Sequence, residues 1–143
     1  MLINAAKHVW VGQRLDYRYD AWQMPQGGID EGEDVEAAAL RELAEETGIG
    51  APLVEIVARA PTELLYDLPP HLIGELWKGK YRGQRQTWFL MRFLGQDTDV
   101  NLETHHPEFA QWKWVEPQTL PSIIVPFKRK LYEDVLAAFL AHL

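Results

Sequence analysis

Apolar and polar residues alternate in several short segments of this chain, and a period of two is typical of β-strands. The alternation is clearest in residues 86–94, where it separates the side chains into two faces: Trp88, Leu90 and Arg92 on one, and Thr87, Phe89, Met91 and Phe93 on the other. The strands predicted in this way cover residues 2–4 and 9–11, which pair as a hairpin, and residues 53–60, 63–68, 86–94 and 109–115.

Two segments follow the helical period instead. Residues 34–47 are predicted to form a helix that ends at Gly48, because glycine commonly terminates helices. Residues 128–142 are predicted to form a second helix, whose apolar stripe recurs at four-residue steps: Phe127, Leu131, Val135, Phe139 and Leu143. Strands mixed with two well-separated helices predict an α/β protein with a mixed sheet sandwiched by helices. Because no repeat or long linker interrupts the pattern, we expect a single domain over residues 1–143.

Composition restricts the function. The chain has no cysteine, which excludes disulfides, thiolate catalysis and cysteine-ligated zinc. No apolar run approaches the roughly 18 residues of a membrane span, and no signal-peptide layout is present, so we expect a cytoplasmic protein with no membrane partner. The formal net charge of −7 argues against duplex DNA as a partner. A polyanionic substrate would therefore need bound cations or a local basic patch.

The predicted helix over residues 34–47 carries three glutamates, Glu42, Glu45 and Glu46, within one sector of about 100°. They continue a strip of small apolar residues, so we expect this face to pack against the sheet. Like charges four residues apart cost about 0.2–0.5 kcal/mol when exposed, and the helix dipole disfavours anions in the last turns. The arrangement is therefore unfavourable without a cation, and hard oxygen ligands favour Mg²⁺ or Mn²⁺.

The segment from Gly27 through Glu33 to residues 41–49 (sequence RELAEETGI) fills every fixed position of a known 23-residue signature. In this it resembles the Nudix box. The resemblance implies an α/β/α sandwich with a loop–helix–loop site for two or three Mg²⁺ (or Mn²⁺) ions. Its implied metal ligands are Glu42, Glu46, Glu45 (directly or through water) and the backbone carbonyl of Gly27. Arg41 and Glu33 would orient the helix and its carboxylates.

Residues 22–29, 83–90, 107–115 and 125–129 resemble a subgroup of that family, the RNA pyrophosphohydrolases and the similar diadenosine tetraphosphate hydrolases. This second resemblance implies that Glu108 is a further metal ligand or the general base. It also implies a substrate site that contacts the base and the phosphates: Phe127, Lys128, Arg85, and Arg14 or its neighbour Gln13. Phe127 fits equally well as the first rung of the C-terminal core stripe. Lys78, Lys80 and Arg82 would add to the basic patch around Arg85.

Together these patterns predict an enzyme that removes pyrophosphate from 5′-triphosphorylated RNA by metal-dependent attack of water. The alternative is a hydrolase that cleaves diadenosine tetraphosphate to ATP and AMP, because both substrates present a purine next to a phosphate chain. Either Glu45 or Glu108 would remove the proton from water. A non-catalytic binding module of the same fold is disfavoured, since no carboxylate of the signature is missing.

Overall fold

The computed structural model describes residues 1–16, 20–73 and 83–143. Its centre is a five-stranded mixed sheet in the order β3-β6-β1-β2-β7. Strand β1 runs parallel to β6, and the other neighbours are antiparallel. The strands of this sheet are β1 (Leu2–Ile3), β2 (Val9–Arg14), β3 (Val54–Arg59), β6 (Phe89–Phe93) and β7 (Phe109–Val115).

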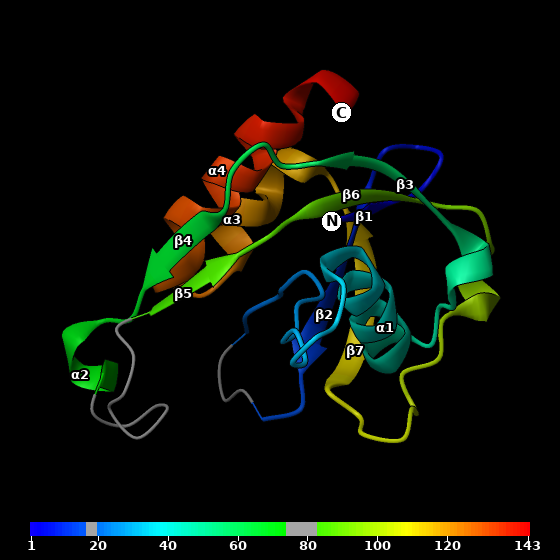
Figure 1. Ribbon diagram of the computed structural model, residues 1–143, viewed down its shortest axis with the longest axis horizontal. Helices are drawn as coiled ribbons and strands as arrows, with labels where there is room; N and C mark the ends of the chain where they lie inside the picture. Colours follow the sequence, from blue (N-terminus) through cyan, green and yellow to red (C-terminus); the bar gives the residue numbers. More distant parts are fainter. Residues whose placement is uncertain (17–19, 74–82) are drawn as a thin grey trace.

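Helices cover both faces of the sheet. Helix α1 (Val35–Thr47) lies on one face, and α3 (Leu120–Ile123) and α4 (Arg129–Phe139) lie on the other (Figure 1). The alternation within the strands explains this layering: Trp10 of β2 points into the core under α1, whereas Val9 and Val11 point into the core under α4. The predicted α/β/α sandwich with a mixed sheet is confirmed.

Helix α1 begins and ends as its sequence predicts. The Asp34 side chain accepts a hydrogen bond from the Ala37 backbone N–H at 3.1 Å, which satisfies one of the free donors of the first turn. Gly48 ends the helix with a φ of 75°, and a Cβ there would lie 2.6 Å from the backbone oxygen of Asn101. Both the conformation and the close approach require glycine, so the end of α1 is fixed.

The strand predicted over residues 86–94 is wrong in its first part. The structure divides this segment into β5 (Gly83–Gln86), which pairs with β4 (Leu64–Asp67) in a separate two-stranded sheet, and β6. The Ala60 N–H, just beyond β3, still donates to the Trp88 carbonyl at 2.9 Å, whereas residues up to Gln86 pair with β4 instead.

Other boundaries differ by less. A short helix that the periodicity does not predict, α2 (Pro70–Ile73), follows β4. The C-terminal helix is shorter than predicted, because α4 ends at Phe139 and continues as a 3₁₀ turn, Leu140–His142. Its apolar stripe is confirmed, since Leu131, Val135 and Phe139 are all buried. Within the described residues, no helix has the length and apolarity needed to cross a membrane.

The packing of α4 generates a stability prediction. Leu131 is fully buried, so Leu131→Ala should lower the free energy of unfolding by about 2–5 kcal/mol through lost contacts and a residual cavity. Leu140 is 69% exposed, and Leu140→Ala should change it by less than about 0.5 kcal/mol. Urea unfolding followed by circular dichroism measures both, and equal losses would contradict the assignment of α4 to the core.

Candidate active site

The guanidinium of Arg41 joins the loop before α1 to the helix itself. It donates through Nε and Nη2 to the two carboxylate oxygens of Glu33 at 2.7 and 2.8 Å, and through Nη2 to the Gly28 carbonyl at 2.9 Å. Its Nη1 donates to Glu42 at 2.9 Å and to Glu45 at 3.2 Å. These hydrogen bonds lower the pKa of Glu33 to about 2. Arg41 therefore sets the position of the loop relative to the acidic helix.

Gly27 lies directly against the carboxylate of Glu42. A Cβ at Gly27 would be 1.9 Å from Glu42 Cδ and 2.0 Å from Glu42 Oε2. Any side chain at this position would push the carboxylate away. The backbone of Gly27 can therefore share a ligand shell with Glu42, which fits its expected role through the carbonyl group.

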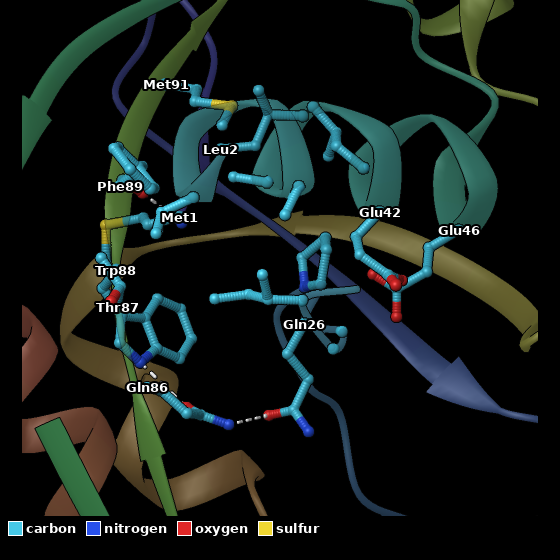
Figure 2. A pocket seen from close by; sticks show the side chains of 18 of the residues that line it. Met1, Leu2, Gln26, Glu42, Glu46, Gln86, Thr87, Trp88, Phe89 and Met91 are labelled. Atoms are coloured by element: carbon cyan, nitrogen blue, oxygen red, sulfur yellow. Dashed lines mark hydrogen bonds between the residues drawn. The ribbon is translucent and has the colours of Figure 1, made fainter. Parts of the chain in front are cut away.

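Glu46 is the buried acid of α1. It is 4% exposed, and burial, followed by the charges of Glu42 and Glu108, raises its pKa to about 9. A backbone hydrogen bond from Gln26 acts in the opposite direction. Glu46 Oε2 is buried without a hydrogen-bond partner. Figure 2 shows the Glu42 and Glu46 carboxylates turned toward one another from successive turns of α1.

These acids fit a divalent cation. A bound cation would give the buried oxygen of Glu46 a partner and would stabilise the ionised carboxylate in place of the proton. Carboxylates are hard ligands, which suits such ions. As the side chains stand, no three acidic or histidine residues in the described part of the chain enclose a point that could hold an ion. Arg41 holds Glu42 and Glu45, so complete ligation would require these side chains to turn.

A cavity of about 370 Å³ extends from the acids along α1. Its apolar wall combines the strip on α1 (Val35, Ala38, Ala39) with Phe89 and Met91 of the sheet. The strip thus faces the sheet as expected, but a cavity remains between them. Its polar end holds Gln26, Glu42 and Glu46 (Figure 2).

Lys128 contacts the side chain of Gln26, the residue whose backbone bonds to Glu46. It is 4% exposed, and its Nζ donates to Gln26 Oε1 over a long 3.5 Å and lies 4.9 Å from the centre of the Tyr66 ring. Burial, followed by the charge of Arg14, lowers its pKa to about 8. A buried ammonium with such weak partners is unfavourable by itself and suits an anionic ligand.

The remaining expected site residues surround this centre. Phe127 is half-buried in the α4 core, with its ring 5.9 Å from that of Tyr66. Arg14 pairs with Asp16 at 2.7 Å and is close enough to affect the pKa values of both Glu46 and Lys128. Arg85 lines the cavity from β5. Lys78, Lys80 and Arg82 of the expected basic patch lie outside the described residues.

Glu108 precedes β7 and is exposed, and its backbone carbonyl accepts from Leu15 N at 3.0 Å. Burial is the main cause of the raised pKa of Glu42 and of Glu46, and the charge of Glu108 contributes to both shifts, so Glu108 lies near these acids. Glu45 is mostly exposed and bonded to Arg41. The structure therefore brings Glu42, Glu46 and Glu108 into electrostatic contact, and the charge of Glu45 also acts on Glu42.

A family model of the NUDIX domain matches residues 1–135. The chain belongs to the Nudix family. Nudix hydrolases generally use divalent metal ions, in agreement with the chemistry of the acidic helix.

Individual relatives cover nearly all of the chain. It is 60% identical over 139 residues to an RNA pyrophosphohydrolase of Sphingopyxis alaskensis, covering 97% of this chain and 88% of the relative. It is 58% identical over 141 residues to an RNA pyrophosphohydrolase of Novosphingobium aromaticivorans, with coverage of 97% and 88%.

Solved structures agree on the fold. An Ap4A hydrolase of C. elegans in a binary complex has a TM-score of 0.66 at 23% identity, covering 99% of this chain and 96% of that one. The dihydroneopterin triphosphate pyrophosphohydrolase of E. coli has a TM-score of 0.71 at 21% identity, covering 96% and 92%.

The buried Glu46 predicts a pH-dependent stability in the absence of metal. Its folded pKa of about 9 exceeds the ordinary value of 4.5, so between these values the folded state retains a proton that the unfolded state loses. Stability should therefore fall as pH rises through this window, by up to about 1.4 kcal/mol per pH unit.

Thermal unfolding in EDTA between pH 5 and 9 measures this effect as the difference between wild type and Glu46→Gln, since the glutamine side chain of the variant cannot titrate. Glu63→Gln, at an exposed position, is the matched control and should follow the wild type. Identical pH slopes for wild type and Glu46→Gln would show that the pKa of Glu46 is not raised in the folded protein.

Proposed function

We propose that the chain removes pyrophosphate from 5′-triphosphorylated RNA, with Gln26 at the centre of the phosphate site. The observation that carries the proposal is a pair of buried ionisable groups of opposite type, each with a shifted pKa, that both contact this residue. The Gln26 backbone bonds to Glu46, a buried carboxylate suited to a cation, and its side chain bonds to Lys128, a buried ammonium suited to an anion. A phosphate chain that carries divalent ions satisfies both.

For the metal, we propose two or three Mg²⁺ or Mn²⁺ ions held by Glu42, Glu46, Glu108, Glu45 and the Gly27 carbonyl. When bound, such ions neutralise the phosphate charges and activate water. The protein fixes the ligands by its own contacts. Arg41 anchors the helix to the loop, and the absent side chain of Gly27 leaves space for Glu42.

In the proposed reaction, water adds to phosphorus and the bridging P–O bond between the α and β phosphates breaks. Pyrophosphate leaves, monophosphorylated RNA remains, and one proton from the water passes to a general base. The contacts favour Glu108 as that base, because Arg41 already holds the carboxylate of Glu45. Lys128 would hold a phosphate oxygen, since the low polarity of its surroundings strengthens such an ion pair.

We propose Phe127 and Arg14 for recognition of the base. Arg14 affects the pKa values of Glu46 and Lys128, so its guanidinium lies near the phosphate site rather than on a remote surface. The ring of Phe127 is only half-buried, which leaves one part of it accessible for stacking while the other supports the α4 core.

Hydrolysis of diadenosine tetraphosphate to ATP and AMP is the alternative. The relatives with 58–60% identity are RNA pyrophosphohydrolases, whereas the Ap4A hydrolase fold match is at 23% identity and supports the architecture alone. The RNA substrate is therefore the better supported of the two.

A direct comparison tests this choice. With Mg²⁺ present, kcat/KM should be at least about tenfold higher for a short 5′-triphosphorylated RNA than for diadenosine tetraphosphate, and pyrophosphate should appear with the RNA. Glu46→Gln should abolish turnover of both while the circular dichroism spectrum is retained. A reversed substrate preference would favour the alternative, and an active Glu46→Gln variant would remove Glu46 from the metal site.

Lys128 provides an independent test. Lys128→Met keeps the alkyl volume and removes the charge, so KM for triphosphorylated RNA should rise about tenfold or more. Stability at pH 7 should be unchanged or higher, because the lowered pKa shows that the buried ammonium is unfavourable below about pH 8. Lys130→Met removes an exposed lysine two residues away and should leave KM unchanged. A normal KM for Lys128→Met would show that no phosphate contacts this side chain.

A further inference from the structure

Three glutamine side chains at the polar end of the cavity form one hydrogen-bonded cluster. Gln86 Nε2 donates to Gln26 Oε1 at 3.1 Å and to Gln84 Oε1 at 3.2 Å, while Gln86 Oε1 accepts from Trp88 Nε1 at 2.9 Å. All three glutamines line the cavity that holds Glu42 and Glu46. Figure 2 shows the bond from Gln86 to the Gln26 oxygen, with the Gln26 nitrogen turned to the far side.

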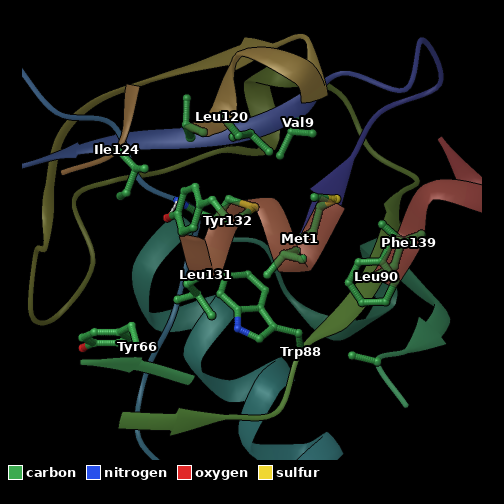
Figure 3. Close-up of a cluster of buried hydrophobic side chains, with 14 of the residues drawn as sticks. Met1, Val9, Tyr66, Trp88, Leu90, Leu120, Ile124, Leu131, Tyr132 and Phe139 are labelled. Atoms are coloured by element: carbon green, nitrogen blue, oxygen red, sulfur yellow. Dashed lines mark hydrogen bonds between the residues drawn. The ribbon is translucent and has the colours of Figure 1, made fainter. Parts of the chain in front are cut away.

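The orientation of this cluster follows from Trp88. An indole N–H can only donate, so the group of Gln86 that faces it must be the oxygen. The indole itself cannot turn, because Trp88 is 5% exposed and packs edge-on against Tyr132 in the core under α4 (Figure 3). Once the Gln86 oxygen is fixed, its NH₂ group must face Gln26 and Gln84.

The two neighbouring amides are oriented in turn. Each presents its oxygen to the Gln86 NH₂ group, and each oxygen accepts a second bond, from Lys128 Nζ at Gln26 and from the Tyr66 hydroxyl at 3.2 Å at Gln84. Turning either amide around would set donor against donor. Their NH₂ groups therefore point away from the cluster, and no residue in the described part of the chain accepts a hydrogen bond from either of them.

We propose that Trp88 and Gln86 are positioning residues that hold the Gln26 and Gln84 amides with their NH₂ groups available to the substrate's phosphate oxygens. The inference rests on the proposed function, since it assigns these donors to a phosphate chain. A phosphate oxygen only accepts hydrogen bonds, so a flipped amide would present an oxygen to it and weaken binding. In a chain of net charge −7, correctly directed neutral donors add affinity without adding further cations.

The first test replaces the central residue. Gln86→Met keeps the length of the side chain and removes both hydrogen-bonding groups, so the neighbouring amides lose their fixed orientation. KM for a short 5′-triphosphorylated RNA should rise about tenfold, and kcat should stay within about twofold, because the metal ligands are not in the cluster. Gln118→Met, at an exposed position outside the cavity lining, should leave both constants unchanged.

The second test separates orientation from packing. Trp88→Phe retains an aromatic ring but removes the N–H, and KM should rise by about threefold. In the double variant Trp88→Phe/Gln86→Met, KM should equal that of Gln86→Met alone, because Trp88 acts through Gln86. Additive effects on KM would overturn the proposal, as would a loss of stability in Trp88→Phe with an unchanged KM.

A measurement without substrate distinguishes this proposal from the proposed function. In ¹⁵N-labelled protein, the Trp88 indole proton should exchange slowly with solvent, and exchange should accelerate in Gln86→Met. Accelerated exchange combined with an absence of RNA hydrolysis by the wild type would leave the cluster intact and reject the RNA substrate. Normal wild-type hydrolysis with unchanged exchange and KM in Gln86→Met would reject the positioning role alone.

Discussion

The site depends on the attachment of the loop before α1 to the helix by Arg41. One planar guanidinium bonds to both oxygens of Glu33, to the Gly28 carbonyl and to two acids of the helix. A lysine could not make this set of contacts, because its donors do not form a planar fork. The loop therefore lies where Gly27 touches Glu42 and where the Gln26 backbone reaches Glu46.

This attachment also divides the acids of α1 into two kinds. Glu42 and Glu45 share the positive charge of Arg41, whereas Glu46 is buried next to Glu42 with an oxygen that has no partner. Burial raises the pKa of both Glu42 and Glu46, but the cost of ionisation is greatest at Glu46. A cation bound there relieves the greatest cost, which couples metal binding to the stability of the loop and helix.

The sequence predicts the sandwich and the acidic helix well, because both follow from local periodicity and from a signature of fixed spacing. The break before β6 does not follow from local alternation, since it depends on which strands the two halves pair with: β5 pairs with β4, whereas β6 pairs with β3 and β1. The i,i+4 spacing does not reveal that Arg41 also reaches its immediate neighbour Glu42, a contact that lowers the pKa of Glu42 against the larger effect of burial. The roles of individual site residues remain predictions for experiment.

The glutamine cluster could not be derived from spacing, although Gln84 and Gln86 flank Arg85 in a segment with a family resemblance. Amides have no charge pattern, and their orientation depends on a tryptophan whose position is set by the α4 core. Gln26 belongs both to this cluster and, through its backbone, to the surroundings of Glu46. Trp88, Gln86 and Gln26 thus connect the packing under α4 to the metal side of the site. Through these contacts, a core residue can affect substrate affinity without touching the substrate.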